Sequence, residues 1–250
     1  MSLSGKVALV TGGSRGIGRA ISLALANDGA NVVVNYARHS KEADETVLSA
    51  QQLGVKAKKI RANLGDPEKI KEMFHDIQRE FGRLDILVNN AASGVQRQAT
   101  ELEVKHWDWT LDINARAAWL CAIESTKLMA PGSRIVNITS LGSSKVIPNY
   151  MSVGVSKAAL EALTRYLAVE LSSQGIIVNA VSGGLVDTDA LRSFENSKNL
   201  IEDSVSRTPA GRMIKAADIS DLVLFLCSEQ SSMIRGQVIV VDGGISLLAL

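Results

Sequence analysis

The stretch VTGGSRGIG, from Val10 to Gly18, decides the fold of this 250-residue chain. It follows an apolar run typical of a strand, KVALV, and opens a run typical of an amphipathic helix, GIGRAISLALAN. Glycines at positions 12, 16 and 18 let the backbone turn sharply and bring bare N–H groups close to a phosphate. A helix that starts here adds the partial positive charge of its N-terminus. The stretch therefore predicts a dinucleotide site rather than a plain tight turn.

The alternation of strand-like and helix-like runs continues along the whole chain. The strand-like runs are apolar on both faces, as parallel strands covered by helices are. We therefore predict an α/β fold, a Rossmann-type doubly wound parallel sheet, in a single dinucleotide-binding and catalytic domain of residues 1–250. Gly29, Gly54 and Gly82 are predicted to end helices in left-handed caps. The least regular segment, at about 186–215, is predicted to be a mobile substrate lid.

Composition narrows the class of protein. A formal net charge of +1 gives no reason to expect nucleic acid or a membrane surface as a partner. We expect no membrane span and no signal peptide, because neither pattern is visible in the sequence. Cys121 and Cys227 are expected to be buried thiols, and His39, His75 and His106 lack the spacing of metal ligands. A cytoplasmic enzyme without a bound metal is the class that these features favour.

The end of the second strand-like run indicates which dinucleotide binds. An NAD site usually has a carboxylate there to accept the ribose hydroxyl groups. This chain has Asn35, Tyr36 and Arg38, and no acidic residue before Glu42. Arg15, inside the glycine stretch, can face the same point. Two guanidinium groups suit a 2′-phosphate, so we predict NADPH, although either arginine could simply be solvated.

With these residues in place, the chain resembles the short-chain dehydrogenase/reductase superfamily over essentially its whole length. The family pattern TGxxxGxG stands at Thr11–Gly18, and its NNAG appears as 89–92 with Ala92 in place of glycine. Its helix asparagine matches Asn114, its strand-end serine matches Ser140, and its usual proline–glycine reads as glycine–glycine at 183–184. The resemblance implies cofactor contacts at Gly12, Ser14, Arg15, Gly16, Ile17, Gly18, Tyr36, Arg38, Asn63, Leu64, Asn90, Ala91, Lys157 and Gly184.

The active-site signature differs from that of most members. Their Tyr-x-x-x-Lys pattern would put the phenol at position 153, but this residue is Val153. Of the three tyrosines, Tyr36 belongs to the cofactor strand. Tyr166 lies nine residues beyond Lys157, and at about 100° per residue it falls on the opposite face of the helix. Tyr150, seven residues before the lysine, is nearly back on the same face and is the candidate acid.

A Tyr-x6-Lys spacing resembles the enoyl-[acyl-carrier-protein] reductases, a divergent branch of the same superfamily. The stretches LG, IPNY and GVSKAALEALTRYLAVEL resemble that branch too. A second tyrosine often stands ten residues before the catalytic one, and here the position is Ser140. The chain is therefore most similar to the NADPH-dependent form known from Bacillus-like bacteria. Ser140 could bind substrate or water, or could simply end the strand.

The spacing suits the chemistry that this resemblance implies. In enoyl-thioester reduction the hydride reaches the β-carbon, and negative charge develops on the thioester oxygen three bonds further along. The acid must therefore lie a few ångströms further from the nicotinamide than in a ketoreductase. Tyr150 would stabilise the enolate, and Lys157 would hold the nicotinamide ribose and lower the tyrosine's pKa. Asn114 is either part of a proton relay or a packing residue at a helix kink.

The resemblance also implies partners and leaves alternatives. The predicted substrate is an enoyl thioester on acyl carrier protein in fatty acid biosynthesis, and Lys198, Arg207, Arg212 and Lys215 could meet that acidic carrier or be solvated. The family commonly forms homotetramers through the long helix that carries Trp119. A 3-oxoacyl-[acyl-carrier-protein] reductase or another short-chain ketoreductase is the first alternative. A non-catalytic NADP(H)-sensing protein is the second.

Overall fold

The computed structural model describes residues 3–187, 201 and 204–248. Its centre is a seven-stranded parallel sheet in the order β3-β2-β1-β4-β5-β6-β9, which confirms the predicted doubly wound fold. The strand order reverses between β1 and β4, so a crevice opens at the carboxyl ends of these two strands. The strands are β1 (Val7–Val10), β2 (Asn31–Tyr36), β3 (Ala57–Arg61), β4 (Ile86–Asn89), β5 (Arg134–Ser140), β6 (Ile177–Gly183) and β9 (Val238–Val241).

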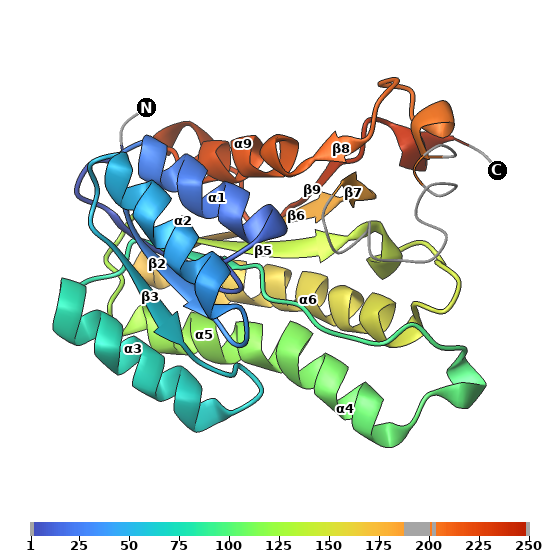
Figure 1. Cartoon of the computed structure of the whole chain (residues 1–250), viewed down its shortest axis with the longest axis horizontal. Helices are drawn as coiled ribbons and strands as arrows, with labels where there is room; N and C mark the ends of the chain where they lie inside the picture. Colours follow the sequence, from blue (N-terminus) through green and yellow to red (C-terminus); the bar gives the residue numbers. More distant parts are fainter. Residues whose placement is uncertain (1–2, 188–200, 202–203, 249–250) are drawn as a thin grey trace.

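Helices cover both faces of the sheet (Figure 1). Side chains alternate along a strand, so Ala8 and Val10 of β1 join one core cluster, and Val7 and Leu9 join the other. This two-sided burial explains why the strands are apolar throughout. The first cluster packs under α1 (Gly16–Asn27), α2 (Ser40–Gln52) and α9 (Ala216–Leu226). The second packs under α3 (Pro67–Phe81), α5 (Ala117–Thr126) and α6 (Met151–Glu170).

Local sequence signals set several helix ends. Gly29, Gly54 and Gly82 adopt φ values of 97°, 86° and 71°, so the predicted left-handed caps are confirmed. Helix α3 begins at Pro67, and the Asp66 carboxylate accepts a hydrogen bond from the backbone N–H two residues later. None of the described helices is long and apolar enough to cross a membrane.

Two features were not visible in the sequence pattern. The long helical run before β5 is divided into α4 (Val104–Leu111), a π-helical turn (Asp112–Arg116) and α5. Short strands β7 (Val186–Asp187) and β8 (Ile214–Lys215) pair in parallel at the two ends of the predicted lid. Half of that lid, at 188–200 and 202–203, lies outside the described residues, so the lid itself stays a prediction.

The two cysteines lie in the core, as expected. Both Cys121 and Cys227 are buried free thiols, and burial raises the pKa of each to about 12. Thiols in this state are poor nucleophiles at neutral pH. Neither therefore contributes to the chemistry of the site.

Candidate active site

The glycine turn after β1 has the tight geometry that its sequence predicts. Gly12 and Gly16 have φ values of 61° and 53°, in the left-handed region that favours glycine. At Gly18 a Cβ atom would stand 2.2 Å from the Gly12 carbonyl oxygen, so only glycine fits there. Helix α1 begins at Gly16, and its free N–H groups therefore face the crevice between β1 and β4.

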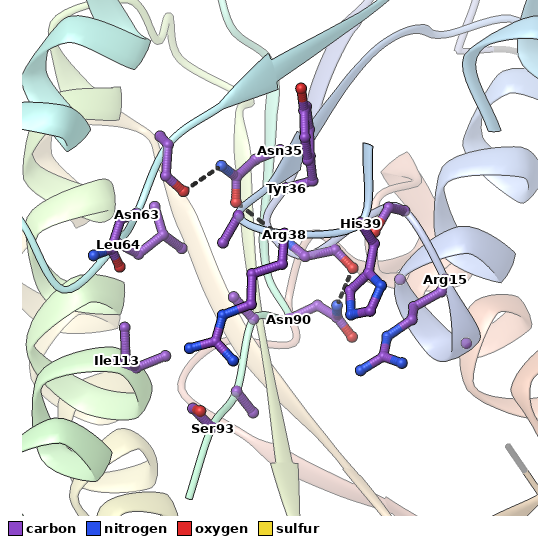
Figure 2. Close-up of a pocket in the computed structure, with 18 of the residues that line it drawn as sticks. Arg15, Asn35, Tyr36, Arg38, His39, Asn63, Leu64, Asn90, Ser93 and Ile113 are labelled. Carbon is purple, nitrogen blue, oxygen red and sulfur yellow. Dashed lines mark hydrogen bonds between the residues drawn. The ribbon is translucent and has the colours of Figure 1, made fainter. Parts of the chain in front are cut away.

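Side chains from the neighbouring strands hold this turn in place. The Gly12 N–H donates to Asn35 Oδ1 of β2 at 3.2 Å. From the loop after β4, Asn90 Nδ2 donates to the Thr11 and Gly12 carbonyl oxygens at 2.9 Å and 3.2 Å. Figure 2 shows both asparagines against the turn. Asn35 lies at the end of β2, the region in which an NAD enzyme carries an acidic residue. Here its side chain supports the glycine turn.

A cavity of about 600 Å³ extends from the glycine turn across the ends of β2 and β3 to the loop after β4. Its volume suits a cofactor-sized molecule. The cavity is lined by all the predicted cofactor residues except two, Lys157 and Gly184. Trp109 and Ile113, from α4 and the π-helical turn, also line it, which the sequence did not indicate. Gly184 instead follows β6 and donates its N–H to the Val241 carbonyl oxygen.

Cationic side chains gather at the end of the cavity next to β2. Arg15 and Arg38 line it, as predicted, with His39 beside them (Figure 2). Arg61 lines the cavity as well. The His39 imidazole lies 3.4 Å from a Glu42 carboxylate oxygen, one turn into α2. Sequence reasoning considered His39 only as a metal ligand, although its position directly after Arg38 is a usable signal. This end suits the 2′-phosphate of NADP(H), because three arginine side chains line it.

Lys157 approaches the end of β5 from helix α6. Its side chain is buried, and Nζ donates to the Ile138 carbonyl oxygen at 2.8 Å. Burial lowers the pKa of Lys157 to about 8, against the opposite effect of the Glu161 charge. The Glu161 carboxylate accepts a hydrogen bond from Thr139 Oγ1 at 2.9 Å. The ammonium group therefore lies at the carboxyl edge of the sheet, where the reactive part of a dinucleotide is expected.

Tyr150 and Ser140 lie together at the same edge. Tyr150 is the N-cap residue of α6, directly before its first turn, and Ser140 is the last residue of β5. Burial raises the pKa of the Tyr150 phenol, and the Ser140 side chain acts in the opposite direction. The lowering of this pKa by the Lys157 charge, which we expected from the sequence, is not found in the described part of the chain. Ser140 Oγ also accepts the Gly142 N–H at 3.0 Å. The serine thus faces the tyrosine, which the sequence left open.

Position 153, where most family members carry the tyrosine, is enclosed. Val153 is buried, and a Cβ atom placed on Gly94 would lie 2.3 Å from its Cγ2. The loop after β4 therefore passes directly over this side chain. A phenol at 153 would need that loop to move.

Asn114 lies in the π-helical turn and connects three elements. Its Oδ1 accepts the Ser93 N–H at 2.8 Å, and its Nδ2 donates to the Ser93 carbonyl and to Ser156 Oγ, both at 2.9 Å. This side chain holds the loop after β4 against helix α6. The contacts favour the packing alternative, and a part in a proton relay stays a prediction. π-Turns often occur at functional sites.

Comparison with known proteins agrees with this geometry. Residues 12–246 match the family described as Enoyl-(Acyl carrier protein) reductase. The chain is 38% identical to 1-cyclohexenylcarbonyl-CoA reductase of Streptomyces collinus over 246 residues, 98% of this chain and 88% of that protein. It is 36% identical to the 3-oxoacyl-[acyl-carrier-protein] reductase FabG of Staphylococcus aureus over 241 residues, 96% and 97% of the two chains.

Solved structures share the whole fold. A short-chain dehydrogenase of Burkholderia cenocepacia in complex with NADP has a TM-score of 0.91 and 35% identity, with 98% of this chain and 100% of that one covered. A short-chain dehydrogenase/reductase of Serratia marcescens has a TM-score of 0.93 and 33% identity, with the same coverage. The chain therefore belongs to the short-chain dehydrogenase/reductase superfamily, and it is an oxidoreductase of that superfamily.

The cationic end of the cavity makes a prediction about cofactor choice. Arg15→Ala and Arg38→Ala are each expected to weaken NADPH binding about 10–100-fold, because a hydrogen bond to a charged group contributes about 1.5–3 kcal/mol. NADH lacks the 2′-phosphate, so its binding is expected to change little. Fluorescence titration with both nucleotides measures the effect, with the exposed Arg79→Ala of α3 as control. Equal losses for both nucleotides would contradict the assignment.

The lowered pKa of Lys157 makes a prediction about pH. The ammonium form, which attracts the anionic cofactor, predominates below about pH 8 and is lost above it. NADPH affinity is therefore expected to fall about tenfold as pH rises through this value. Titration between about pH 7 and pH 9.5 measures the change. Lys157→Met is expected to abolish the step, while Lys127→Met, an exposed lysine paired with Glu124, keeps it. If NADPH affinity still falls over this pH range in Lys157→Met, the titration of another group causes the change.

Proposed function

We propose that this protein is an NADPH-dependent enoyl-[acyl-carrier-protein] reductase, which reduces the trans-2 double bond of enoyl thioesters in fatty acid biosynthesis. One observation carries the proposal. The phenol beside Ser140, at the end of the strand β5 that Lys157 contacts, comes from position 150, whereas position 153 holds an enclosed valine. The acid therefore has the Tyr-x6-Lys placement that resembles enoyl reductases.

The roles of the side chains follow from their surroundings. NADPH, when bound, supplies a hydride to the β-carbon of the substrate. Tyr150, kept protonated by burial, donates a hydrogen bond to the thioester oxygen as negative charge develops there. Lys157 holds its ammonium group at the end of β5 and contributes positive charge beside the ribose position. Ser140, whose side chain lies beside the tyrosine and lowers its pKa, is placed to orient the phenol.

The named reactions of the relatives support a thioester substrate without selecting the reaction. The Streptomyces relative is named for reduction of a cyclohexenyl CoA thioester, and the Staphylococcus relative for a 3-oxoacyl carrier-protein thioester. The second name, at similar identity, keeps a 3-oxoacyl reductase as the alternative function. The enclosed Val153 weighs against it, because the tyrosine of the usual ketoreductase pattern is missing.

We further propose a cytoplasmic homotetramer that receives its substrate on acyl carrier protein. Apolar side chains stand exposed on the helices of one face, and these include Trp119, Tyr166 and Val169, at 46%, 68% and 74% exposure. Exposed apolar surface of this kind is typical of subunit contacts. Of the basic residues expected to meet the carrier, Arg212 is paired with Asp218 at 2.6 Å, and Lys198 lies outside the described residues.

The choice between the two reactions is tested directly. With NADPH, the protein is expected to oxidise cofactor in the presence of a crotonyl thioester and much more slowly with an acetoacetyl thioester. Absorbance of the reduced nicotinamide at saturating substrate measures both rates. Turnover of the acetoacetyl thioester alone would favour the ketoreductase, and no turnover of either would favour a nucleotide-sensing protein.

The role of the phenol has a matched control on the same helix. Tyr150→Phe is expected to lower kcat for the enoyl thioester about 100–1000-fold, the effect of removing one well-placed donor to a developing oxyanion. Tyr166→Phe, which removes only a hydroxyl group and keeps the apolar ring assigned to the subunit contact, is expected to keep full activity. Steady-state kinetics of both variants, with NADPH binding measured in parallel, make the comparison. Unchanged turnover in Tyr150→Phe would remove the tyrosine from the mechanism.

A further inference from the structure

The backbone around Tyr150 leaves the direction of its side chain to neighbouring packing. Asn149, just before it, has a φ of 61°, so the chain turns sharply into helix α6. The Tyr150 N–H donates to the Ile147 carbonyl at 3.2 Å, and its own carbonyl accepts the Gly154 N–H at 2.7 Å. These hydrogen bonds fix the position of the Tyr150 backbone. The direction of its ring depends on the residues that pack against it.

Gly142 provides that surface. An added Cβ atom at this position would stand only 2.7 Å from both Cδ1 and Cε1 of the Tyr150 ring, and 3.3 Å from Ser140 Oγ. One edge of the ring therefore lies flat against the Gly142 backbone, next to the serine hydroxyl. A rigid aromatic ring cannot bend away from an added methyl group, so it would have to turn as a whole.

Gly154 closes the other side of the same contact. A Cβ atom there would stand 2.6 Å from the Gly142 carbonyl oxygen and 3.9 Å from Tyr150 Cδ1. It occupies the fourth position of helix α6, where alanine is normally more stable than glycine. Neither glycine has a positive φ, so the backbone would accept alanine at both positions. The requirement for glycine is one of space.

We propose that Gly142 and Gly154 are positioning residues, which together hold the phenol of Tyr150 against Ser140. The inference rests on the proposed function for the role of the phenol, but the contact itself does not depend on which thioester is reduced. It also connects two parts of the sequence, because the tyrosine at 150 can reach its place only if positions 142 and 154 carry no side chain. A tyrosine at position 150 therefore requires glycine at both 142 and 154.

The test is a double-mutant cycle. Gly142→Ala is expected to lower kcat about 100-fold, as a misplacement of about 1 Å does, with NADPH affinity unchanged. In a Tyr150→Phe background, where the hydroxyl is already gone, Gly142→Ala is expected to lower kcat no further. Ser144→Ala, an exposed position in the same loop, is the control with wild-type kcat. The same fold loss in both backgrounds, or full activity of Gly142→Ala, overturns the proposal.

A thermal measurement separates this proposal from the proposed function. Gly142→Ala is expected to lower the melting temperature of the wild type but not of Tyr150→Ala, which has no ring to displace. Equal lowering in both backgrounds overturns the contact, whatever the reaction is. If Gly142→Ala does not fold, Gly154→Ala takes its place. The same loss of kcat is expected for it. Replacing a helix glycine with alanine usually raises stability, but no such gain is expected here. A fully active, more stable Gly154→Ala contradicts the proposal.

Discussion

Helix α1 lies so close to the turn after β1 that no side chain fits between them. An added Cβ at Gly18 would stand 2.2 Å from the Gly12 oxygen and 2.5 Å from Asn90 Nδ2. This contact brings the helix N-terminus, the end of β1 and the loop after β4 to one point. Once they meet there, the crevice where the strand order reverses becomes a phosphate site, and the cofactor's orientation decides where every other group must act.

Much of the fold could be predicted because its signals are local. The strands are recognised by short runs of residues that are apolar on both faces. The helix ends are recognised by single glycines such as Gly82, which form left-handed caps. The π-helical turn around Asn114 was not predictable in this way. It is stabilised by bonds to Ser93 and Ser156, which are distant in sequence, and an uninterrupted helical pattern runs through it. The β7–β8 pair likewise depends on contacts between distant segments.

In the candidate site, too, features set by local sequence could be predicted, and features set by contacts between distant residues could not. The phosphate contacts that we expect at the turn were predicted from the glycine spacing, and the cavity is lined by nearly all the residues predicted to bind the cofactor. His39 was missed because a histidine read alone suggests a metal, whereas its neighbour Arg38 gives it a different meaning. The pairing of Tyr150 with Ser140 was not predictable, because it depends on how the loop between them, which includes Gly142, packs against the tyrosine ring.

Burial acts on the two central groups in opposite senses, and this decides what they can do. It raises the pKa of Tyr150 and lowers that of Lys157, so each group is pushed toward its neutral form. For the tyrosine the neutral form is the proton donor, which is the form that the enolate oxygen of the proposed reaction would require. The lysine, with a pKa of about 8, remains mostly charged at neutral pH, and the phosphates of a bound dinucleotide favour that charge further. A pocket that keeps the acid protonated and the cation charged at the same pH is suited to reduction, where substrate gains a hydride and a proton.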